Sequence, residues 1–274
     1  MKSAFLIAAP TSGSGKTTIA RGLMALLTQK GYSVQPFKCG PDYIDTKFHK
    51  TVCGRPSINL DSFMAAPEHI HDLFEHYGKE ADVCVVEGMM GLFDGYERDK
   101  GSSAEIASIL RLPAILVVDA KSAAYSMAPL LQGFINFRKD VHIAGVIFNK
   151  VGSSRHFEML RQVCDDLQIT CFGYLPKNSS LEQGSRYLGL DFSEKTENEE
   201  LINLIESHID WKSICSSLVR ERRTVRPRAT DCASEGDGLC VRRRRTKSEL
   251  RSQCRKLQFH LSRKHRLICL RQFL

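Results

Sequence analysis

Pro-Thr-Ser-Gly-Ser-Gly-Lys-Thr-Thr, residues 10–18, directly follows the apolar segment Ala4–Ala9, and most of what can be predicted starts from this stretch. After it, Thr17–Leu27 places apolar side chains at the spacing of a helix. The pattern therefore predicts a short buried strand, a glycine-rich loop and a helix that begins near Thr17. Loops of this layout bind phosphate, because backbone N–H groups and the positive end of the helix both face the anion.

Within this loop, Gly13 and Gly15 let backbone N–H groups converge on an anion. Lys16 can reach the outer phosphates of a nucleotide, and Thr17 offers a hydroxyl to Mg²⁺. The strict pattern G-x-x-x-x-G-K-[ST] is not met, because Pro10 stands where its first glycine belongs. A plain turn before an ordinary helix is the alternative, but the preceding strand and the Gly-Lys-Thr-Thr start of the helix disfavour it. The predicted phosphate-binding residues are Ser12, Gly13, Ser14, Gly15, Lys16, Thr17 and Thr18.

Composition places the chain among ordinary globular proteins. Of 274 residues, 42% are hydrophobic and 26% are charged, and no apolar run approaches the length of a membrane span. The apolar N-terminal segment is too short for a signal peptide. The ten cysteines show no C-x-x-C spacing, which favours reduced thiols over a disulfide framework or a zinc site. We therefore expect a cytoplasmic protein without a membrane partner.

The net charge of +8 is unevenly distributed along the chain. Residues 1–211 hold 21 Lys and Arg against 26 Asp and Glu, a balance of −5. Residues 212–274 hold 18 against 5, a balance of +13. The larger part therefore gives no indication of nucleic-acid binding. We expect a domain over residues 1–211 and a separate basic tail over residues 212–274.

The tail over residues 212–274 has 14 arginines, five cysteines and almost no apolar periodicity. Arg242–Arg245 is a block of four consecutive positive charges. One interpretation is a disordered segment that binds nucleic acid or a membrane surface. The other is a segment never selected as protein, as when a coding frame shifts. The cysteine content and the absence of pattern favour the second interpretation, and we assign the tail no function.

Strand and helix patterns alternate along residues 1–211. The predicted strands are continuous apolar runs, which is typical of a parallel sheet covered by helices on both faces. They are Ala4–Ala9, Tyr32–Lys38, Ala81–Val86, Pro113–Val118, Ile143–Phe148 and Ile169–Tyr174. The predicted helices are Thr17–Leu27, Pro67–Tyr77, Ser103–Leu110, Met127–Phe137, Phe157–Asp166 and Glu199–Ile209, and Arg55–Phe63 is predicted to be irregular. The fold class is α/β, a mostly parallel, doubly wound sheet of the P-loop NTPase type.

Carboxylates follow three of these strands, at the edge where open α/β sheets bind ligands. A bound triphosphate needs Mg²⁺, and Mg²⁺ takes one or two carboxylates as hard oxygen ligands. The candidates are Asp45, Glu87 and Asp119. Each could be a solvated loop acid, but Glu87 lies between Val86 and Gly88, where a buried charge is costly unless it is ligated.

Four segments together resemble one family of enzymes. They are Ser12–Thr18, Phe37–Asp45 (Phe-Lys-Cys-Gly-Pro-Asp-Tyr-Ile-Asp), Val86–Gly95 (Val-Glu-Gly-Met-Met-Gly-Leu-Phe-Asp-Gly) and Arg186–Leu190. In this order they are similar to the amidation domain of cobyrinic acid a,c-diamide synthase and of its aerobic counterpart, hydrogenobyrinic acid a,c-diamide synthase. The resemblance runs from about residue 3 to residue 211, and its second and third segments are far more specific than a P-loop alone.

This resemblance implies a fold like that of dethiobiotin synthetase and a carbon–nitrogen ligase of cobalamin biosynthesis that needs ATP and Mg²⁺. ATP would phosphorylate the c and then the a acetate side chain of a corrinoid, and ammonia derived from glutamine would attack each acyl phosphate. Phosphorylation turns a poor leaving group into a good one, and the site supplies cations to the transferring phosphoryl group. A homodimer is compatible with this interpretation.

The resemblance also implies roles by position. Lys16, Lys38 and Asp45 would be the catalytic residues, with Lys38 offsetting charge on the γ-phosphate and the incoming carboxylate. Thr17, Asp45 and Glu87 would hold Mg²⁺. The substrate side would be formed by Asp42, Tyr43, Gly91, Leu92, Phe93, Asp94 and Gly95. The base would contact residues at later strand ends, Asn149, Lys150 and Pro176, although a plain turn role for Asn149 is an equal alternative.

The sequence departs from the family in its last part. Members of the family continue into a glutaminase domain with a cysteine nucleophile in a strand–turn–helix elbow. Here the late cysteines lie in the basic tail without such a setting; they are Cys215, Cys232, Cys240, Cys254 and Cys269. We expect a synthetase half without a working glutaminase, which uses free ammonia at best or is inactive.

Three other functions stay open at this stage. A MinD/ParA-type switch ATPase would carry a lysine five residues before Lys16, where this chain has Thr11. A related ligase, dethiobiotin synthetase or cobyric acid synthase, is disfavoured by the segment Glu87–Gly95. A nucleic-acid-binding protein would depend on the tail, and its binding would show a steep salt dependence.

Overall fold

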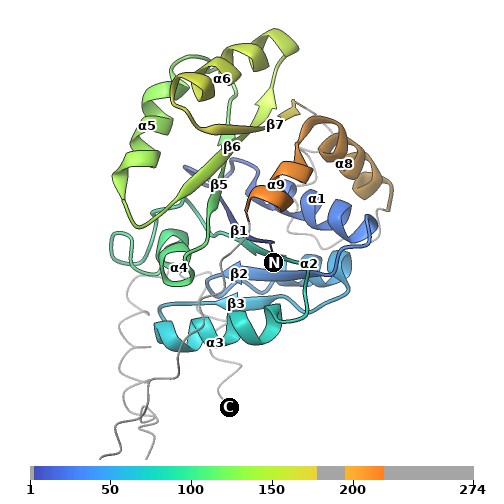
Figure 1. Cartoon of the computed structure of the whole chain (residues 1–274), viewed down its shortest axis with the longest axis vertical. Helices are drawn as coiled ribbons and strands as arrows, with labels where there is room; N and C mark the ends of the chain where they lie inside the picture. The colour runs from blue at the N-terminus through green and yellow to red at the C-terminus, as the bar shows by residue number, and fades with distance from the viewer. Residues whose placement is uncertain (1–2, 178–194, 219–274) are drawn as a thin grey trace, which may run out of the picture. The chain divides into compact units, whose positions relative to one another are not determined.

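Strands and helices alternate through the part of the chain that the structure describes (Figure 1). The computed structural model describes residues 3–177 and 195–218, with the side chains of residues 3–177 and 199–218. All of them belong to the first of two compact units, Met1–Arg223. The strands are β1 Ser3–Ala8, β2 Val34–Cys39, β3 Ile58–Leu60, β4 Val83–Glu87, β5 Ala114–Asp119, β6 Ile143–Val151 and β7 Thr170–Pro176. The helices are α1 Lys16–Gln29, α2 Asp45–Cys53, α3 Pro67–Gly78, α4 Ser103–Leu110, α5 Met127–Phe137, α6 Ser154–Asp166, α8 Lys195–His208 and α9 Trp211–Ser217.

The seven strands form one sheet in the order β3-β2-β4-β1-β5-β6-β7, and every pairing is parallel. The predicted parallel α/β sheet is confirmed. β1 lies between β4 and β5, so the chain runs from β1 toward one edge of the sheet and, after β4, continues toward the other edge. Ligands of open α/β sheets bind at the carboxyl ends of the strands next to such a reversal. We therefore expect a ligand-binding site at the loops after β1, β2 and β4.

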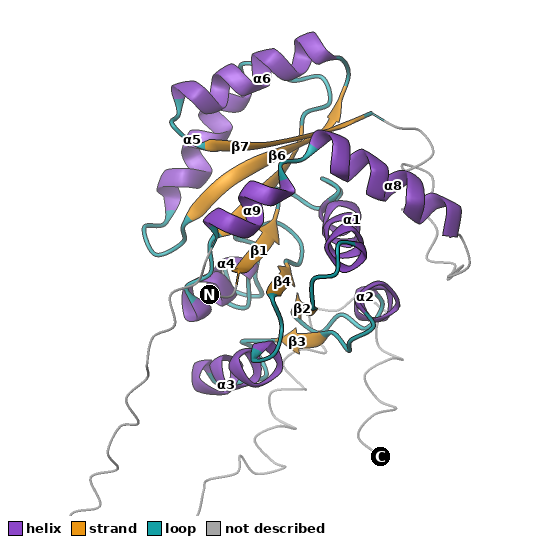
Figure 2. Ribbon diagram, turned by 45° about the vertical axis from the view of Figure 1, so that its right-hand side comes forward, coloured by secondary structure: helices purple, strands orange, loops and turns teal. Residues whose placement is uncertain are grey.

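Two apolar layers cover the sheet, one on each face. Ala4, Leu6 and Ala8 of β1 belong to the layer that includes α3, α4, α5 and α6. Phe5 and Ile7, which alternate with them, belong to the layer that includes α1, α8 and α9. Figure 2 shows α3, α4 and α5 on one side of the sheet and α1, α2 and α8 on the other. Both faces of the strands are buried, which explains why the strand sequences are continuous apolar runs.

Two short elements, β3 and α2, depart from the prediction. β3, Ile58–Leu60, lies inside the segment that was expected to be irregular, and three residues are too few to show a period. α2, Asp45–Cys53, is mostly polar and ends at Gly54, whose φ of 66° is in the left-handed region. The cap comes from a residue that precedes the helix: Asp42 Oδ1 accepts a hydrogen bond from Asp45 N (3.1 Å).

The folded unit continues past residue 211, at which the composition changes. Ile214 of α9 is buried in the same layer as α1 and α8. The carbonyl oxygen of Leu218 accepts hydrogen bonds from Ala4 N (3.1 Å) and Ser3 Oγ (3.2 Å) of β1. The charge pattern did not reveal this helix, because it is only seven residues long and just Trp211, Ile214 and Cys215 contact the core layer.

The described cysteines form no disulfide bonds with one another. Within residues 3–177 and 199–218 the cysteines are free thiols: Cys39, Cys53, Cys84, Cys164, Cys171 and Cys215. Arg186–Leu190 and the other four cysteines of the tail lie outside the described residues. In the described ranges no helix combines the length and the apolar character that a membrane span requires.

Candidate nucleotide and magnesium site

The loop between β1 and α1 is shaped to surround an anion. Gly13 (φ 80°) and Gly15 (φ 95°) adopt the left-handed backbone that glycine favours. Gly15 is the N-cap of α1, and no side chain caps the helix there. Ser14 instead turns into the loop and donates a hydrogen bond to Thr11 O (2.9 Å). The first N–H groups of α1 are therefore left for a ligand at the positive end of the helix dipole.

Lys16 is the cation of this loop, and it has no carboxylate partner among the described side chains. It is buried, yet no Asp or Glu of residues 3–177 and 199–218 lies within ion-pair distance of its ammonium group. Burial and the neighbouring charge of Lys38 lower its pKa. A buried ammonium group that makes no ion pair with the described carboxylates is suited to receive a phosphate.

Glu87, the last residue of β4, is fully buried and ionised. Its Oε1 accepts hydrogen bonds from Thr17 Oγ1 (2.5 Å) and lies 3.0 Å from the ammonium group of Lys38. Its Oε2 lies 2.7 Å from His49 Nε2. Burial by itself would raise the pKa of this carboxyl, but the hydrogen bond to His49 and the charge of Lys38 lower it to about 2. The structure thus places an oxygen of Thr17 directly beside an oxygen of Glu87, as the predicted metal site requires.

Lys38, on β2, is fully engaged by the protein. Its ammonium group lies 2.6 Å from Asp45 Oδ2, 3.0 Å from Glu87 Oε1 and 3.3 Å from Gly88 O, which accounts for its three N–H bonds. Burial lowers the pKa of this group, but Glu87 and Asp45 raise it well above the ordinary value. Lys38 therefore neutralises two carboxylates. Its predicted contact with the phosphate or substrate requires one of these bonds to open.

Asp45 and Asp42 reach the same cation from the start of α2. Burial and the negative charge of Glu87 raise the pKa of Asp45, against the opposing effect of Lys38. Asp42 Oδ2 lies 3.7 Å from Lys38 Nζ, while Asp42 Oδ1 caps the helix. The three carboxylates predicted for the metal and substrate side therefore converge on one lysine.

The oxygens of Thr17 and Glu87 fit Mg²⁺ that is held together with a nucleotide. Mg²⁺ binds hard oxygens at about 2.0–2.1 Å, so neighbouring ligand oxygens lie about 2.9 Å apart. Thr17 Oγ1 and the ionised Glu87 Oε1, 2.5 Å apart, are close to this separation. Within the described part of the chain no cluster of three or more His, Cys, Asp or Glu side chains can hold a metal ion by itself. Phosphate oxygens and water would complete the coordination, as Mg²⁺ prefers at phosphate sites.

Asn149, on β6, braces the phosphate loop from the other side. Its Nδ2 donates a hydrogen bond to Ser14 O (3.0 Å). A Cβ atom on Gly15 would lie only 2.1 Å from this nitrogen, so the loop has room for glycine alone at that position. Asn149 thus has a structural role in the loop, and its contact with the base stays a prediction.

Lys150 and Asp119 form an ion pair beside the same loop. Lys150 Nζ lies 2.6 Å from Asp119 Oδ2 and 3.4 Å from Gly13 O. Asp119 had been one of three candidates for Mg²⁺, but it is occupied by this lysine and by the backbone N–H of Lys121 (2.9 Å). Pro176 ends β7 opposite Val151 of β6, one strand further from the loop.

The loop after β4 exposes some but not all of the residues that were predicted to contact the substrate. Asp94 is exposed, and its Oδ2 accepts a hydrogen bond from Gly91 N (3.0 Å). Its charge acts on Lys16, which places it on the phosphate side. Leu92, by contrast, is fully buried, and its N–H donates to Ala9 O (2.7 Å). Leu92 is therefore a core residue, which corrects the prediction that it lines the substrate side.

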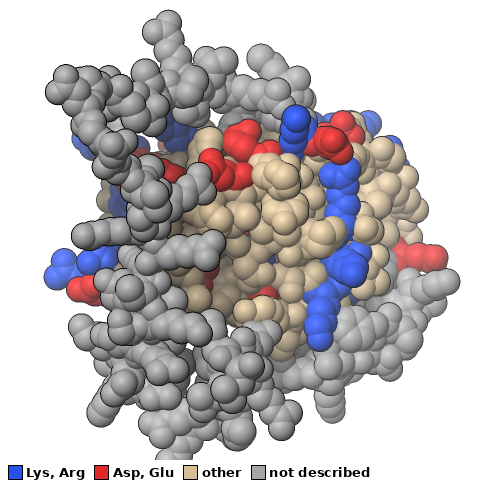
Figure 3. All heavy atoms as spheres, turned by 90° about the horizontal axis from the view of Figure 1, so that it is seen from below, with Lys and Arg blue, Asp and Glu red and all other residues tan. Residues whose placement is uncertain are grey.

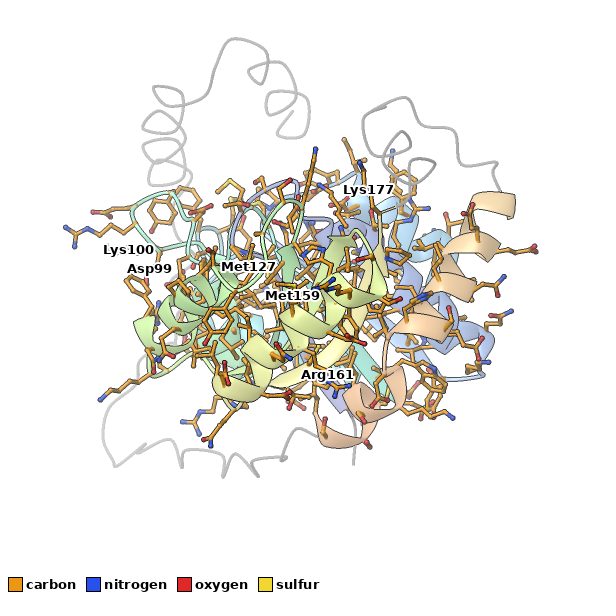
Figure 4. The ribbon with its side chains drawn as sticks, turned by 90° about the horizontal axis from the view of Figure 1, so that it is seen from above. Asp99, Lys100, Met127, Met159, Arg161 and Lys177 are labelled. Atoms are coloured by element: carbon orange, nitrogen blue, oxygen red, sulfur yellow. The ribbon has the colours of Figure 1, made fainter. Side chains whose placement is uncertain are left out.

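The outer end of this loop is tied to α5. Phe93 stacks on Phe134, with ring centroids 5.6 Å apart. Arg138, next to the end of α5, forms ion pairs with Asp99 and Asp140. Figure 4, seen from above, shows Asp99 and Lys100 at the margin of the molecule. The loop is thus anchored at both ends, and Gly95 lies between the anchors.

Exposed apolar side chains follow the carboxyl ends of β2, β3 and β4. They are Tyr43, Ile44, Met64, Met90 and Tyr96, and Tyr43 has 57% of its surface exposed. Seen from the side of α3, the described surface is largely uncharged in its middle, with acidic and basic side chains at its margins (Figure 3). We name these five residues the apolar rim.

His49 is the main residue of the site that sequence reasoning missed. It is fully buried on α2, with its Nδ1 3.0 Å from Ser57 Oγ and its Nε2 on Glu87. The signal was its distance of four residues from Asp45, which places both on one face of a helix. Because α2 was not predicted, that spacing carried no meaning.

A family model, the CobQ/CobB/MinD/ParA nucleotide binding domain, matches residues 5–188. The chain belongs to this family. All side chains of the site described above lie within the matched residues, from the phosphate loop to Pro176. Membership of this nucleotide-binding family agrees with the P-loop prediction made from residues 10–18.

Two curated relatives are similar to most of this CobQ/CobB/MinD/ParA chain. It is 47% identical over 223 residues to the cobyrinate a,c-diamide synthase of Caldanaerobacter subterraneus subsp. tengcongensis, covering 79% of this chain and 49% of that protein. It is 47% identical over 194 residues to the hydrogenobyrinate a,c-diamide synthase of Mycobacterium tuberculosis, covering 69% of this chain and 42% of that protein. The resemblance stated from the sequence motifs is confirmed. The chain spans about half the length of the curated relatives it matches.

Solved structures give weaker similarities. The cell division protein FtsY of Thermotoga maritima aligns with a TM-score of 0.46 at 16% identity, over 65% of this chain and 63% of that chain. The hydrogenase maturation factor HypB of Archaeoglobus fulgidus aligns with a TM-score of 0.45 at 12% identity, over 75% and 89%. At this level neither structure bears on the function of this chain.

Proposed function

We propose that the chain binds ATP with Mg²⁺ and uses it to activate an acetate side chain of cobyrinic or hydrogenobyrinic acid for amidation. The observation that carries the proposal is that the buried Lys16, which makes no ion pair with any described carboxylate, lies in the same loop as Thr17, whose hydroxyl adjoins the carboxylate of Glu87. The relatives named as cobyrinate and hydrogenobyrinate a,c-diamide synthases supply the substrate class.

The proposed reaction has two balanced steps. A carboxylate oxygen of the corrinoid attacks the γ-phosphorus of ATP, the bond from this phosphorus to the bridging oxygen breaks, and ADP leaves. Ammonia then attacks the carbonyl carbon of the acyl phosphate, the bond from carbon to the phosphate oxygen breaks, and phosphate and a proton leave. Lys16 and the N–H groups of α1 would hold the phosphates, and Mg²⁺ bound at Thr17 and Glu87 would offset their charge.

The apolar rim supports a large substrate beside this phosphate site. Tyr43 and Ile44 follow directly on Asp42, and Met90 lies between Glu87 and Asp94 in the chain. An amphipathic ring system with acetate side chains could rest on the rim and direct one carboxylate toward Lys38 and the γ-phosphate. This placement requires the exposed aromatic and methionine side chains to contact the macrocycle.

The nitrogen source and assembly belong to the proposal as well. We propose that free ammonia serves as nucleophile for the synthetase site of this chain, whether or not a glutaminase supplies it. We also place the reaction in the cytoplasm, where ATP is available. The prediction of a homodimer stays a prediction.

The test is an amidation assay of the full chain with ATP, Mg²⁺ and ammonium. ADP release and an amide product, both dependent on cobyrinic or hydrogenobyrinic acid, are the expected result. Diaminopelargonic acid is the matched control, because dethiobiotin synthetase would use it instead. ATP hydrolysis that ignores every carboxylate substrate would instead support a switch ATPase. Efficient use of glutamine would contradict the expectation of a chain without a working glutaminase.

A further inference from the structure

The carboxylate of Glu87 is held in one orientation by partners on both of its oxygens. Thr17 and Lys38 lie at Oε1, which faces the phosphate loop, and His49 lies at Oε2. Glu87 has no exposed surface, so its carboxylate is held by protein groups and not by bulk water. Of the three, only His49 lies on the side away from the proposed metal position.

His49 is itself held in place. Its side chain is fully buried, and its Nδ1 lies 3.0 Å from Ser57 Oγ, in the segment that leads into β3. Because a carboxylate only accepts hydrogen bonds, Nε2 must carry the proton that Glu87 receives. The Ser57 hydroxyl can then donate to Nδ1, which defines a chain of hydrogen bonds from Ser57 through His49 to Glu87.

We propose, on the basis of the proposed function, that His49 is a positioning residue that turns Glu87 Oε1 toward Mg²⁺. Asp45 and His49 lie four residues apart on α2, so one helix delivers both a carboxylate for Lys38 and the donor that orients Glu87. Residues that hydrogen-bond to a metal ligand from behind set its orientation, and their loss typically weakens metal affinity about 10- to 100-fold. The alternative is a core histidine that only fills space and satisfies its own nitrogens.

Two substitutions separate these roles. In His49→Gln the amide nitrogen can reach the position of Nε2 and still donate to Glu87. In His49→Asn the shorter side chain reaches only the position of Nδ1, near Ser57, and leaves Glu87 Oε2 without a donor. Both variants bury an amide of similar polarity, so their difference reports the contact with Glu87.

The measurement is ATP binding to the full chain by isothermal titration, in EDTA and over a series of Mg²⁺ concentrations. We expect His49→Asn to raise the half-saturating Mg²⁺ concentration about 10- to 100-fold. His49→Gln stays within a few-fold of the unsubstituted chain, and ATP affinity in EDTA is the same for all three. Ser57→Ala removes the contact with His49 Nδ1 and should raise the half-saturating Mg²⁺ concentration less than His49→Asn does. If His49→Asn does not fold, Ser57→Ala takes its place in the test.

The outcomes distinguish this inference from the proposed function. An unchanged Mg²⁺ requirement in His49→Asn, or an equal rise in His49→Asn and His49→Gln, would overturn the positioning role alone. A loss of ATP affinity in EDTA by the same factor would also overturn it, because the damage would then concern the whole loop. If the unsubstituted chain shows no Mg²⁺-dependent ATP binding, the proposed function fails, and the role of His49 fails with it.

Discussion

At the scale of single residues, the site depends on the contrast between two buried lysines. Lys38 lies among Asp45, Glu87 and Gly88 O and is neutralised by them. Lys16, one loop away, has no carboxylate within ion-pair distance among the described side chains, and burial lowers its pKa. Lys38 thus stabilises the folded protein, whereas the ammonium group of Lys16 is available to an anion.

This contrast predicts opposite effects of the same substitution. Lys38→Met leaves the buried Glu87 and the half-buried Asp45 without their cation and should reduce the free energy of unfolding by about 3–5 kcal/mol. Lys16→Met removes a desolvated charge, so stability should change by less than about 1 kcal/mol, while ATP binding is lost. Urea unfolding and ATP titration of both variants check this. Equal losses of stability would show that Lys16 is also paired.

The low pKa of Glu87 predicts a pH dependence of stability. Its pKa is lowered from 4.5 to about 2 in the folded chain, so its contribution is fully present above pH 4.5 and is lost as the pH falls toward 2. The contribution is on the order of 3 kcal/mol. The difference in unfolding free energy between the unsubstituted chain and Glu87→Gln should stay constant from about pH 7 to pH 5 and shrink below that. If this difference did not vary with pH, the neighbours of Glu87 would not lower its pKa in the folded chain.

At the scale of elements, the long apolar strands were predictable and the short polar elements were not. Ala4–Ala9 and Pro113–Val118 are buried on both faces, so their composition alone identifies them. The two short elements depend on contacts with residues outside them. Asp42 caps α2, and β3 is defined by its pairing with β2. For this reason Lys16, Thr17 and Glu87 could be found from the sequence, whereas His49 on α2 could not.

The phosphate loop offers a prediction at this scale. Gly15→Ala places a methyl group 2.1 Å from Asn149 Nδ2 and strains a backbone at φ 95°. Gly31→Ala, after α1, has a similar φ of 87° but open space around it. Both should cost about 1–2 kcal/mol of stability from backbone strain, but only Gly15→Ala should weaken ATP binding. Equal ATP affinities in the two variants would contradict the role given to the loop.

At the scale of the whole molecule, the site depends on a sheet that reverses its winding at β1. The loops after β1, β2 and β4 meet there, so one position combines the phosphate loop, Lys38 and Glu87. The folded unit that supports this arrangement runs through α9, beyond the residue where the charge pattern changes. Its last helix packs on the layer that also contains α1.

This packing predicts that α9 stabilises the folded unit. Ile214→Ala removes a side chain that is 1% exposed and should lower the free energy of unfolding by about 2–5 kcal/mol. Ser216→Ala, on the exposed side of the same helix, should change it by less than about 0.5 kcal/mol. Thermal or urea unfolding of the full chain measures both. Equal stabilities would place α9 outside the cooperative unit.

The most direct test of the account is a crystal structure of the chain with Mg²⁺ and a non-hydrolysable ATP analogue. We predict a triphosphate at the N-terminus of α1, with Lys16 on its outer phosphates and Mg²⁺ bound to both Thr17 Oγ1 and a Glu87 oxygen. A nucleotide bound elsewhere, or a metal ion that contacts neither residue, would contradict the account.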